Sequence, residues 1–154
     1  MTEPVELQVE VFKAVRAAAP PAFIREVLTR AATVPEIGAR LAAGPSTAAV
    51  RLTTDVELQR LNRSYAGEDH ATDVLSFAGS GDHLGDIAIS WPAVVRQARE
   101  HGHPQTTELA LLCVHGLLHL LGWDHASVRE RKEMSRLTVQ ALELSRLRLA
   151  SGRL

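Results

Sequence analysis

Apolar residues concentrate in one stretch of this chain, residues 109–121, where almost every side chain is hydrophobic. A helix that is apolar on all sides belongs in the middle of a core rather than on its surface. The pattern therefore predicts a central, buried helix. Two polar side chains interrupt it, His115 and His119, and because they are four residues apart they leave the same face of the helix.

The rest of the chain shows shorter patterns with the periods of strands and helices. Alternating or strand-forming residues, bounded by turn residues, predict strands at residues 5–11, 48–53, 73–78 and 84–90. Prolines and capping residues predict helices that begin near Pro21, Thr54, Ser90 and Ser127. This order of elements predicts an α+β fold, a small mixed sheet covered by helices, in a single domain that spans residues 1–154.

A third histidine follows the central helix closely. Gly122 suits the positive φ of a helix end, so the chain can turn there and bring His125 back towards His115 and His119. Burying an imidazole costs free energy unless a partner compensates it. Three neutral imidazoles at this spacing predict an open metal site, with a position left for water or substrate. Zinc suits these donors best, although nickel, copper or iron would fit them as well. The alternative is three separate histidines that happen to lie close in sequence.

The same spacing separates two kinds of metal chemistry. The histidines and the glycine match H-E-x-x-H-x-x-G-x-x-H, the metal-binding helix of metzincin proteases. The glutamate of that motif is the general base, and here its position is Gly116, which can neither take nor give a proton. A metallopeptidase-like hydrolase is therefore an alternative that lacks its base.

Three segments of the chain resemble the YbeY family, bacterial metal-dependent endoribonucleases of ribosomal RNA maturation. They are HGLLHLLGWDH at residues 115–125, LNRSYAGEDHATDVLSF at residues 61–77 and LGDIAIS at residues 84–90. The resemblance implies a zincin-like fold with the metal-binding helix at its centre. It also implies one zinc ion, cleavage of single-stranded RNA, and ribosomal RNA with the small subunit or its assembly factors as partners.

One departure from the family concerns position 66. The family usually carries an arginine after the tyrosine of the first upstream segment, and this chain has Ala66. Arg63 is the candidate replacement as a catalytic residue, because three residues along a helix end lie on roughly the same face. The alternative for Arg63 is an exposed charge at a helix end. Without a replacement, the chain would be a slow nuclease or a non-catalytic ribosome-assembly factor.

Acidic residues near the predicted site each have two interpretations. Asp124 either orients an imidazole or takes a proton from the attacking group, or it closes the turn after Gly122. Asp86 either supports the site or bonds to backbone at a strand end. For Glu108, at the start of the central helix, a favourable interaction with the helix dipole is the preferred explanation.

The remaining candidates are weaker. Four histidines lie in polar or turn-rich sequence and are predicted to be solvated: His70, His83, His101 and His103. Ser76 and Phe77 are candidates for an RNA groove through hydrogen bonding and stacking, although strand core is the preferred interpretation of Phe77.

Amino-acid composition limits the classes of protein to which this chain can belong. Hydrophobic residues at 45% and charged residues at 23% are ordinary for a globular protein, and the single cysteine, Cys113, excludes a disulfide framework. The acidic start of the chain lacks the build of a secretory signal, and no run reaches the roughly 18 apolar residues of a membrane span. A cytoplasmic location without a membrane partner is expected.

Charge is distributed unevenly along the chain. The net charge of −1 does not indicate a nucleic-acid-binding protein, and no DNA partner is expected. Residues 126–154, however, hold seven basic and three acidic side chains. They either follow a phosphate backbone or form the solvated face of an amphipathic helix.

Overall fold

A four-stranded mixed sheet forms the base of the fold. The computed structural model describes residues 5–41, 44–66 and 72–154. The strands lie in the order β1 (Val5–Lys13), β2 (Gly44–Thr53), β4 (His83–Ser90) and β3 (Val74–Ala78). β1, β2 and β4 run parallel, whereas β3 pairs antiparallel with β4 in a hairpin. The α+β class and the mixed sheet are confirmed, and β2 begins at Gly44 rather than at residue 48.

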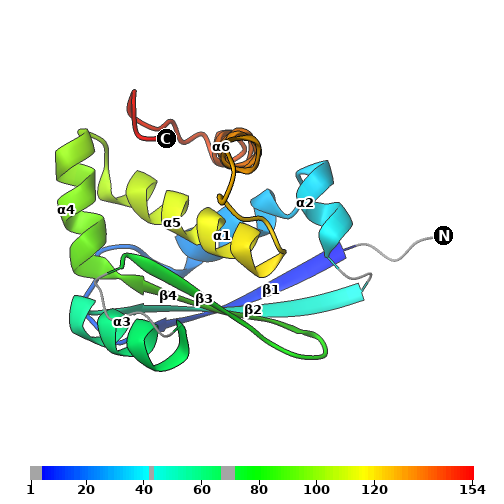
Figure 1. Cartoon of the computed structure of the whole chain (residues 1–154), viewed down its shortest axis with the longest axis horizontal. Coiled ribbons are helices and arrows are strands. Elements are labelled where there is room, and N and C mark those ends of the chain that lie inside the picture. Colours follow the sequence, from blue (N-terminus) through cyan, green and yellow to red (C-terminus); the bar gives the residue numbers. More distant parts are fainter. Residues whose placement is uncertain (1–4, 42–43, 67–71) are drawn as a thin grey trace.

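Helices cover the two faces of this sheet unequally (Figure 1). Five lie on one side: α1 (Pro21–Ala31), α2 (Pro35–Arg40), α4 (Trp91–His101), α5 (Gln105–Leu120) and α6 (Val128–Glu143). The opposite side carries α3 (Asp55–Leu61) and its continuation, the π-helix η1 (Asn62–Ala66). Within the described part of the chain, none of these helices combines the length and hydrophobicity that a membrane span requires.

Local capping interactions fix where three of the helices begin. The hydroxyl of Thr54 accepts a hydrogen bond from the backbone N–H of Glu57, as predicted for the start of α3. Ser90 and Ser127 cap α4 and α6 in the same way. The sequence pattern missed α2, because six residues complete fewer than two helical turns and show no periodicity.

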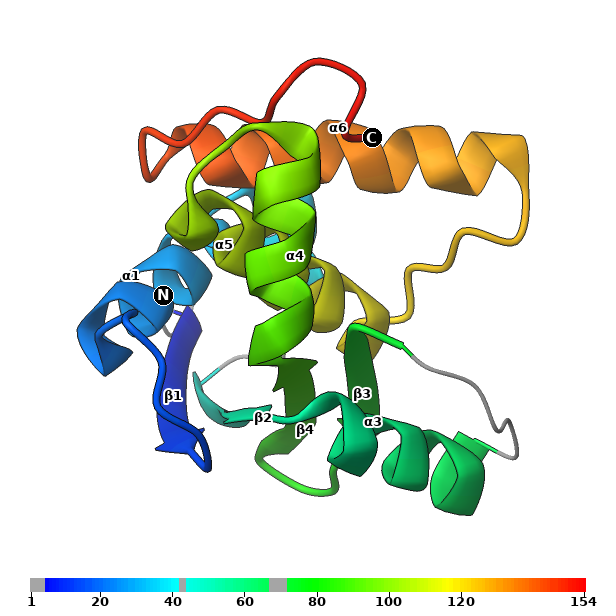
Figure 2. The same cartoon turned by 90° about the vertical axis from the view of Figure 1, so that its left-hand side faces the viewer.

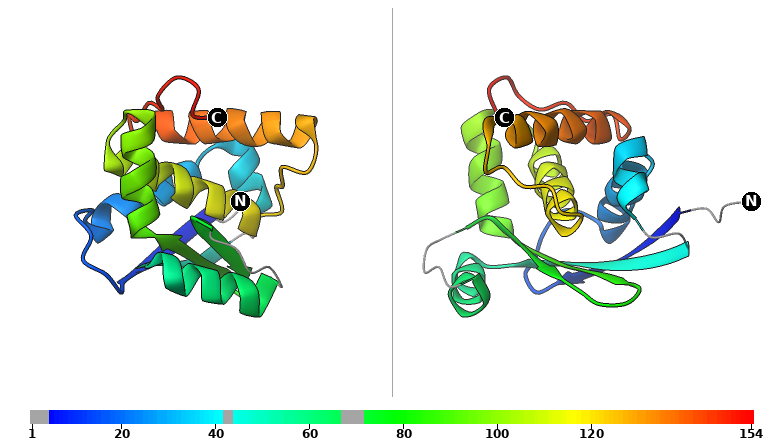
Figure 3. Two further views of the ribbon diagram at one scale, coloured as in Figure 1. Left: turned by 60° about the vertical axis from the view of Figure 1, so that its left-hand side comes forward. Right: turned by 45° about the vertical axis from the view of Figure 1, so that its right-hand side comes forward.

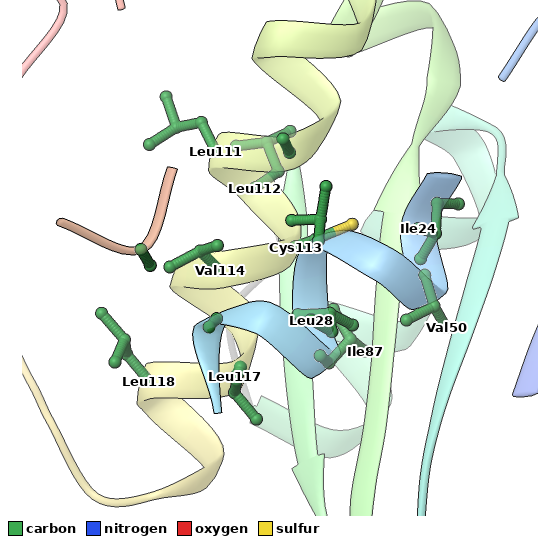
Figure 4. Packing of buried hydrophobic residues seen from close by; sticks show 14 of the residues in the cluster. Ile24, Leu28, Val50, Ile87, Leu111, Leu112, Cys113, Val114, Leu117 and Leu118 are labelled. Atoms are coloured by element: carbon green, nitrogen blue, oxygen red, sulfur yellow. The ribbon is translucent and has the colours of Figure 1, made fainter. Parts of the chain in front are cut away.

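The central position of α5 confirms the prediction of a buried helix. It packs on β3 and β4 from one side and is enclosed by α1, α4 and α6, with α6 crossing above it (Figures 1 and 3). Figure 4 shows its apolar side chains in one cluster with residues of α1 and the sheet, including Ile24, Leu28, Val50 and Ile87. Each fully buried leucine contributes about 2 kcal/mol by leaving water, so this helix anchors the core.

Gly116 sets how closely α5 approaches the sheet. A Cβ atom at this position would lie 2.5 Å from Cγ2 of Ile87 on β4. The hydroxyl of Ser76 on β3 donates a hydrogen bond of 2.9 Å to the Gly116 carbonyl oxygen. The glycine therefore brings the helix against the two strands and fixes its height above them.

Candidate metal centre

A pocket of about 490 Å³ opens beside α5 and contains all three predicted metal ligands. His115 and His119 line it from successive turns of α5, and His125 lines it from the loop that follows. Its remaining lining comes from β3 and the preceding residues, α5, α6 and the last segment: Thr72, Asp73, Val74, Ser76, Leu112, Arg131, Met134, Ser135, Arg153 and Leu154. The structure thus brings the three histidines together, and their binding of one ion stays a prediction.

A cluster of potential ligand atoms joins two of the pocket's histidines with Asp124. One potential ligand atom from each of His119, Asp124 and His125 lies within 4.8 Å of the other two. Among the described residues, this is the group of side chains that could hold a metal ion. The rings of His119 and His125 meet edge to face, with centroids 5.2 Å apart. His115 lies one turn further into the pocket. Asp124 is therefore placed with the histidines, where it can act as a ligand or a neighbouring base.

The orientation of His119 is set by the loop that follows α5. Its Nδ1 lies 3.0 Å from the carbonyl oxygen of Trp123. Because a carbonyl only accepts, Nδ1 carries the hydrogen and Nε2 keeps its lone pair free for a metal. Gly122, with φ of 95°, makes the turn that brings this carbonyl back, as predicted.

Two neighbouring helices hold the Trp123 side chain in place. The guanidinium carbon of Arg40, at the end of α2, lies 3.6 Å from the centre of the Trp123 ring, a cation–π contact. Arg40 also donates to the Leu121 carbonyl oxygen, and the indole N–H of Trp123 donates to Glu133 of α6. The loop that carries the third histidine is therefore clamped between α2 and α6.

Burial keeps the imidazoles of α5 in the form that binds metals. It lowers the pKa of His115 to about 4, and the nearby charges of His119, Arg153 and His125 act in the same direction. Burial also lowers the pKa of His119, assisted by His125. Both rings are therefore neutral at neutral pH, as transition-metal ligation requires. The donor set and its protonation fit a zinc ion.

The two predicted catalytic residues lie in different places. Asp124 is exposed, and its Oδ1 accepts a hydrogen bond of 2.7 Å from the backbone N–H of His125, the turn contact that the sequence offered as an alternative. Arg63 is exposed on η1, which continues α3 on the sheet face opposite α5 (Figure 1), and it does not line the pocket. Ala66 ends η1; its side chain, like all of His70, lies outside the described residues.

Glu108 and His103 are buried together behind the pocket. The carboxylate of Glu108 is fully buried and accepts hydrogen bonds from Arg153 Nε at 3.0 Å and Nη2 at 2.6 Å. His103, only 4% exposed, donates to it at 2.7 Å and receives the backbone N–H of Ala150 at its other ring nitrogen. The side-chain amide of Gln97 also donates a hydrogen bond to the Glu108 carboxylate.

The solvated prediction for His103 is therefore wrong. Glu108 does lie in the first turn of α5, where the helix dipole favours it, but no sequence pattern indicated its burial and its partners. Burial raises the pKa of Glu108, but the hydrogen bonds from Arg153 and His103 outweigh it and hold this pKa below its ordinary value of 4.5. No local signal pointed to this cluster, because Arg153 is 45 residues away from Glu108 in sequence.

The other candidates divide between the two faces of the sheet. Asp86 is exposed and accepts from His83, whose second ring nitrogen bonds to the Thr47 hydroxyl, so His83 is not simply solvated. Because Ile87 faces α5, its neighbour Asp86 faces away, and it does not line the pocket. Phe77 pairs with Asp86 in register and is half-buried, with its ring 5.6 Å from that of Tyr65.

The fold and the pocket together suit the class of α+β proteins that bind a metal ion on a central helix. A central buried helix of an α+β fold presents histidines to an open pocket, and the donor set suits a catalytic metal ion. The family model described as "Endoribonuclease YbeY" matches residues 11–145. The chain belongs to the YbeY family, as its resemblance in sequence predicted.

Individual relatives agree with this assignment. A protein of Roseiflexus sp. (strain RS-1) named "Endoribonuclease YbeY" is 48% identical over 123 residues, which cover 68% of this chain and 75% of the relative. One of the same name from Halalkalibacterium halodurans is 43% identical over 127 residues, covering 73% and 77%. The solution structure of TM1509 from Thermotoga maritima superposes with a TM-score of 0.59 at 23% identity, covering 90% and 92%, and shares the fold.

Proposed function

We propose that this protein is a single-domain, zinc-dependent endoribonuclease that cuts single-stranded segments of ribosomal RNA precursors. The observation that supports it most is the convergence of His115, His119 and His125 on one pocket, in a chain whose relatives are named as endoribonucleases. The proposed setting is the cytoplasm, with the small ribosomal subunit or its assembly factors as partners.

The residues of the pocket suit this chemistry. A zinc ion held by the three histidines would polarise the scissile phosphodiester and lower the pKa of a water molecule. Asp124, which lies beside His119 and His125 and has a side chain 64% exposed, is free to accept a proton from the attacking water. His125 is 62% exposed, so an extended, unpaired strand can reach this end of the pocket.

The metallopeptidase alternative is disfavoured by more than a missing base. Because a Cβ at position 116 would lie 2.5 Å from a methyl group of Ile87, the motif's glutamate has no room at this point of α5. That helix face packs on the sheet rather than facing the pocket. The position of the protease base is therefore part of the core in this protein.

One comparison tests the proposal. Zinc-loaded protein is incubated with a structured ribosomal RNA fragment and, separately, with casein, each with and without chelator. We expect cleavage of unpaired RNA that the chelator and the His119→Ala change abolish, with casein intact. His101→Ala, at the end of α4 and outside this pocket, is the matched control and should cleave normally.

Two results would contradict the proposal. Cleavage of casein that is lost in the His119→Ala protein would favour a peptidase. Intact RNA with fully metal-loaded protein would favour a non-catalytic assembly factor.

A further inference from the structure

The last segment of the chain completes the wall of the histidine pocket. The match to the family model ends at residue 145. Beyond it, residues 146–154 turn back along α6 on the side of α4 (Figure 2), and the backbone N–H of Ala150 bonds to His103. Arg153 and Leu154 then line the same pocket as the histidines. This segment therefore adds a cationic side chain to the site that the family match does not include.

Arg153 is held rigidly by Glu108, and this pairing uses only two of its five N–H donors. Its side chain is only 15% exposed, and Glu108, fully buried, binds its Nε and Nη2 atoms at 3.0 and 2.6 Å. A guanidinium has five N–H donors, so this clamp leaves the Nη1 group and one Nη2 hydrogen unused. A braced arginine loses little conformational entropy when its free edge binds a phosphate. The clamp thus prepares Arg153 as a donor to an anion in the pocket.

Arg131 brings a second positive charge to the same pocket. It is exposed on α6, lines the pocket, and has no carboxylate partner within the described part of the chain. Asp73 also faces this space, but burial raises its pKa and Gln97 donates to its carboxylate. Since Glu108 already neutralises Arg153, Arg131 supplies the charge and Arg153 supplies oriented donors.

We propose that Arg131 and Arg153 together bind a backbone phosphate of single-stranded RNA beside the histidines. This inference rests on the proposed function and names the contact by which the substrate is held. Arginine suits the role because its planar fork donates two parallel hydrogen bonds to a phosphate. The contact reads no base, so it serves any unpaired sequence.

Binding without cleavage tests the contact at Arg131. The affinity of a short, fluorescently labelled single-stranded RNA is measured by anisotropy in excess chelator, over a series of salt concentrations. We expect Arg131→Gln to bind about tenfold more weakly, the loss typical of one charge-assisted hydrogen-bonded contact. The slope of log affinity against log salt should fall by about 0.7, the value for one phosphate of a single strand. Arg129→Gln, on the same helix but outside the pocket, should match the wild type.

A second variant tests Arg153 without leaving Glu108 unpaired. Arg153→Lys keeps a positive charge opposite the carboxylate but removes the free edge of the guanidinium. We expect affinity for the RNA to fall by about tenfold with the salt slope unchanged, because the charge is kept and only the oriented donors are lost. If Arg153 were only structural, Arg153→Lys would lower the melting temperature and leave the affinity for RNA unchanged, which would overturn its role in the phosphate contact.

The outcomes separate this inference from the proposed function. If the wild type binds and cleaves RNA, and both arginine variants bind with unchanged affinity and slope, the phosphate contact is wrong and the nuclease stands. If the wild type neither binds nor cleaves RNA, both fall. Should Arg153→Lys fail to fold, the Arg131→Gln measurement decides alone.

Discussion

Replacing Arg153 by methionine should lower the free energy of unfolding, because the buried carboxylate of Glu108 then loses its charged partner. The change removes two hydrogen bonds from a carboxylate that is fully buried. Breaking a buried ion pair on one side costs about 3–5 kcal/mol, because the remaining charge stays desolvated. His103 and Gln97 still donate to Glu108, so we expect the lower end, about 3 kcal/mol. For a chain of this length, the melting temperature should then fall by about 6–12 °C.

The dependence of this loss on pH identifies its origin. In the wild type the pKa of Glu108 lies below its ordinary value of 4.5, so its ion pair stabilises the fold above pH 4.5 and less as pH falls through the lowered pKa. Without Arg153, burial acts with less opposition and raises the pKa of this carboxyl relative to wild type. The stability difference between the two proteins should therefore be largest at neutral pH and shrink in acid.

The assay is urea unfolding of both proteins across a pH series. Arg148→Met, an exposed arginine of the same segment, is the matched control and should lose little. The double variant Glu108→Gln with Arg153→Met should recover part of the loss, since no charge then stays buried. A loss below about 1 kcal/mol for Arg153→Met, which is the scale of a surface pair, would refute the reasoning. A loss that is constant down to strongly acidic pH would do so as well.

Three further predictions concern the site. The purified protein should hold close to one zinc ion by elemental analysis, and His119→Ala should lose most of it; full retention would falsify the ligand assignment. Ala66→Arg should raise single-turnover RNA cleavage by about tenfold, roughly 1.4 kcal/mol, without changing metal content. If it has no effect while Arg63→Ala abolishes cleavage, Arg63 is the substitute. Gly116→Glu should destabilise the fold by about 3 kcal/mol or more through collision with Ile87 and burial of a carboxylate, and it should not confer casein cleavage; a stable, proteolytic variant would contradict the packing.

Some features of the fold and of the site were identifiable from sequence because their signals are local. Thr54, Ser90 and Ser127 cap helices through contacts three residues away, so pattern alone located those starts. His115 and His119 lie four residues apart on a helix whose apolar surroundings are visible in sequence. Helical geometry then dictates that they share a face.

The surroundings of other residues were not predictable because their partners are remote in sequence. Glu108 looked like an ordinary first-turn glutamate, and only the return of the last segment gives it Arg153 as a partner. Arg40 carried no signal at all, yet it stacks on Trp123 beside the histidines. Asp86 lay in a segment that resembles the family, but the register of β4 turns it away from the pocket.

By itself, the sequence determined the central helix, the spacing of its histidines, the turn after it and the missing protease base. Each of these depends on the identity and spacing of neighbouring residues, which a single helix or turn converts directly into geometry. Only the tertiary structure decided which face of the sheet each strand residue meets, and that Arg131 and Arg153 join the histidines. Periodicity orients a side chain relative to its own element, whereas the choice of partner depends on how separate elements pack together.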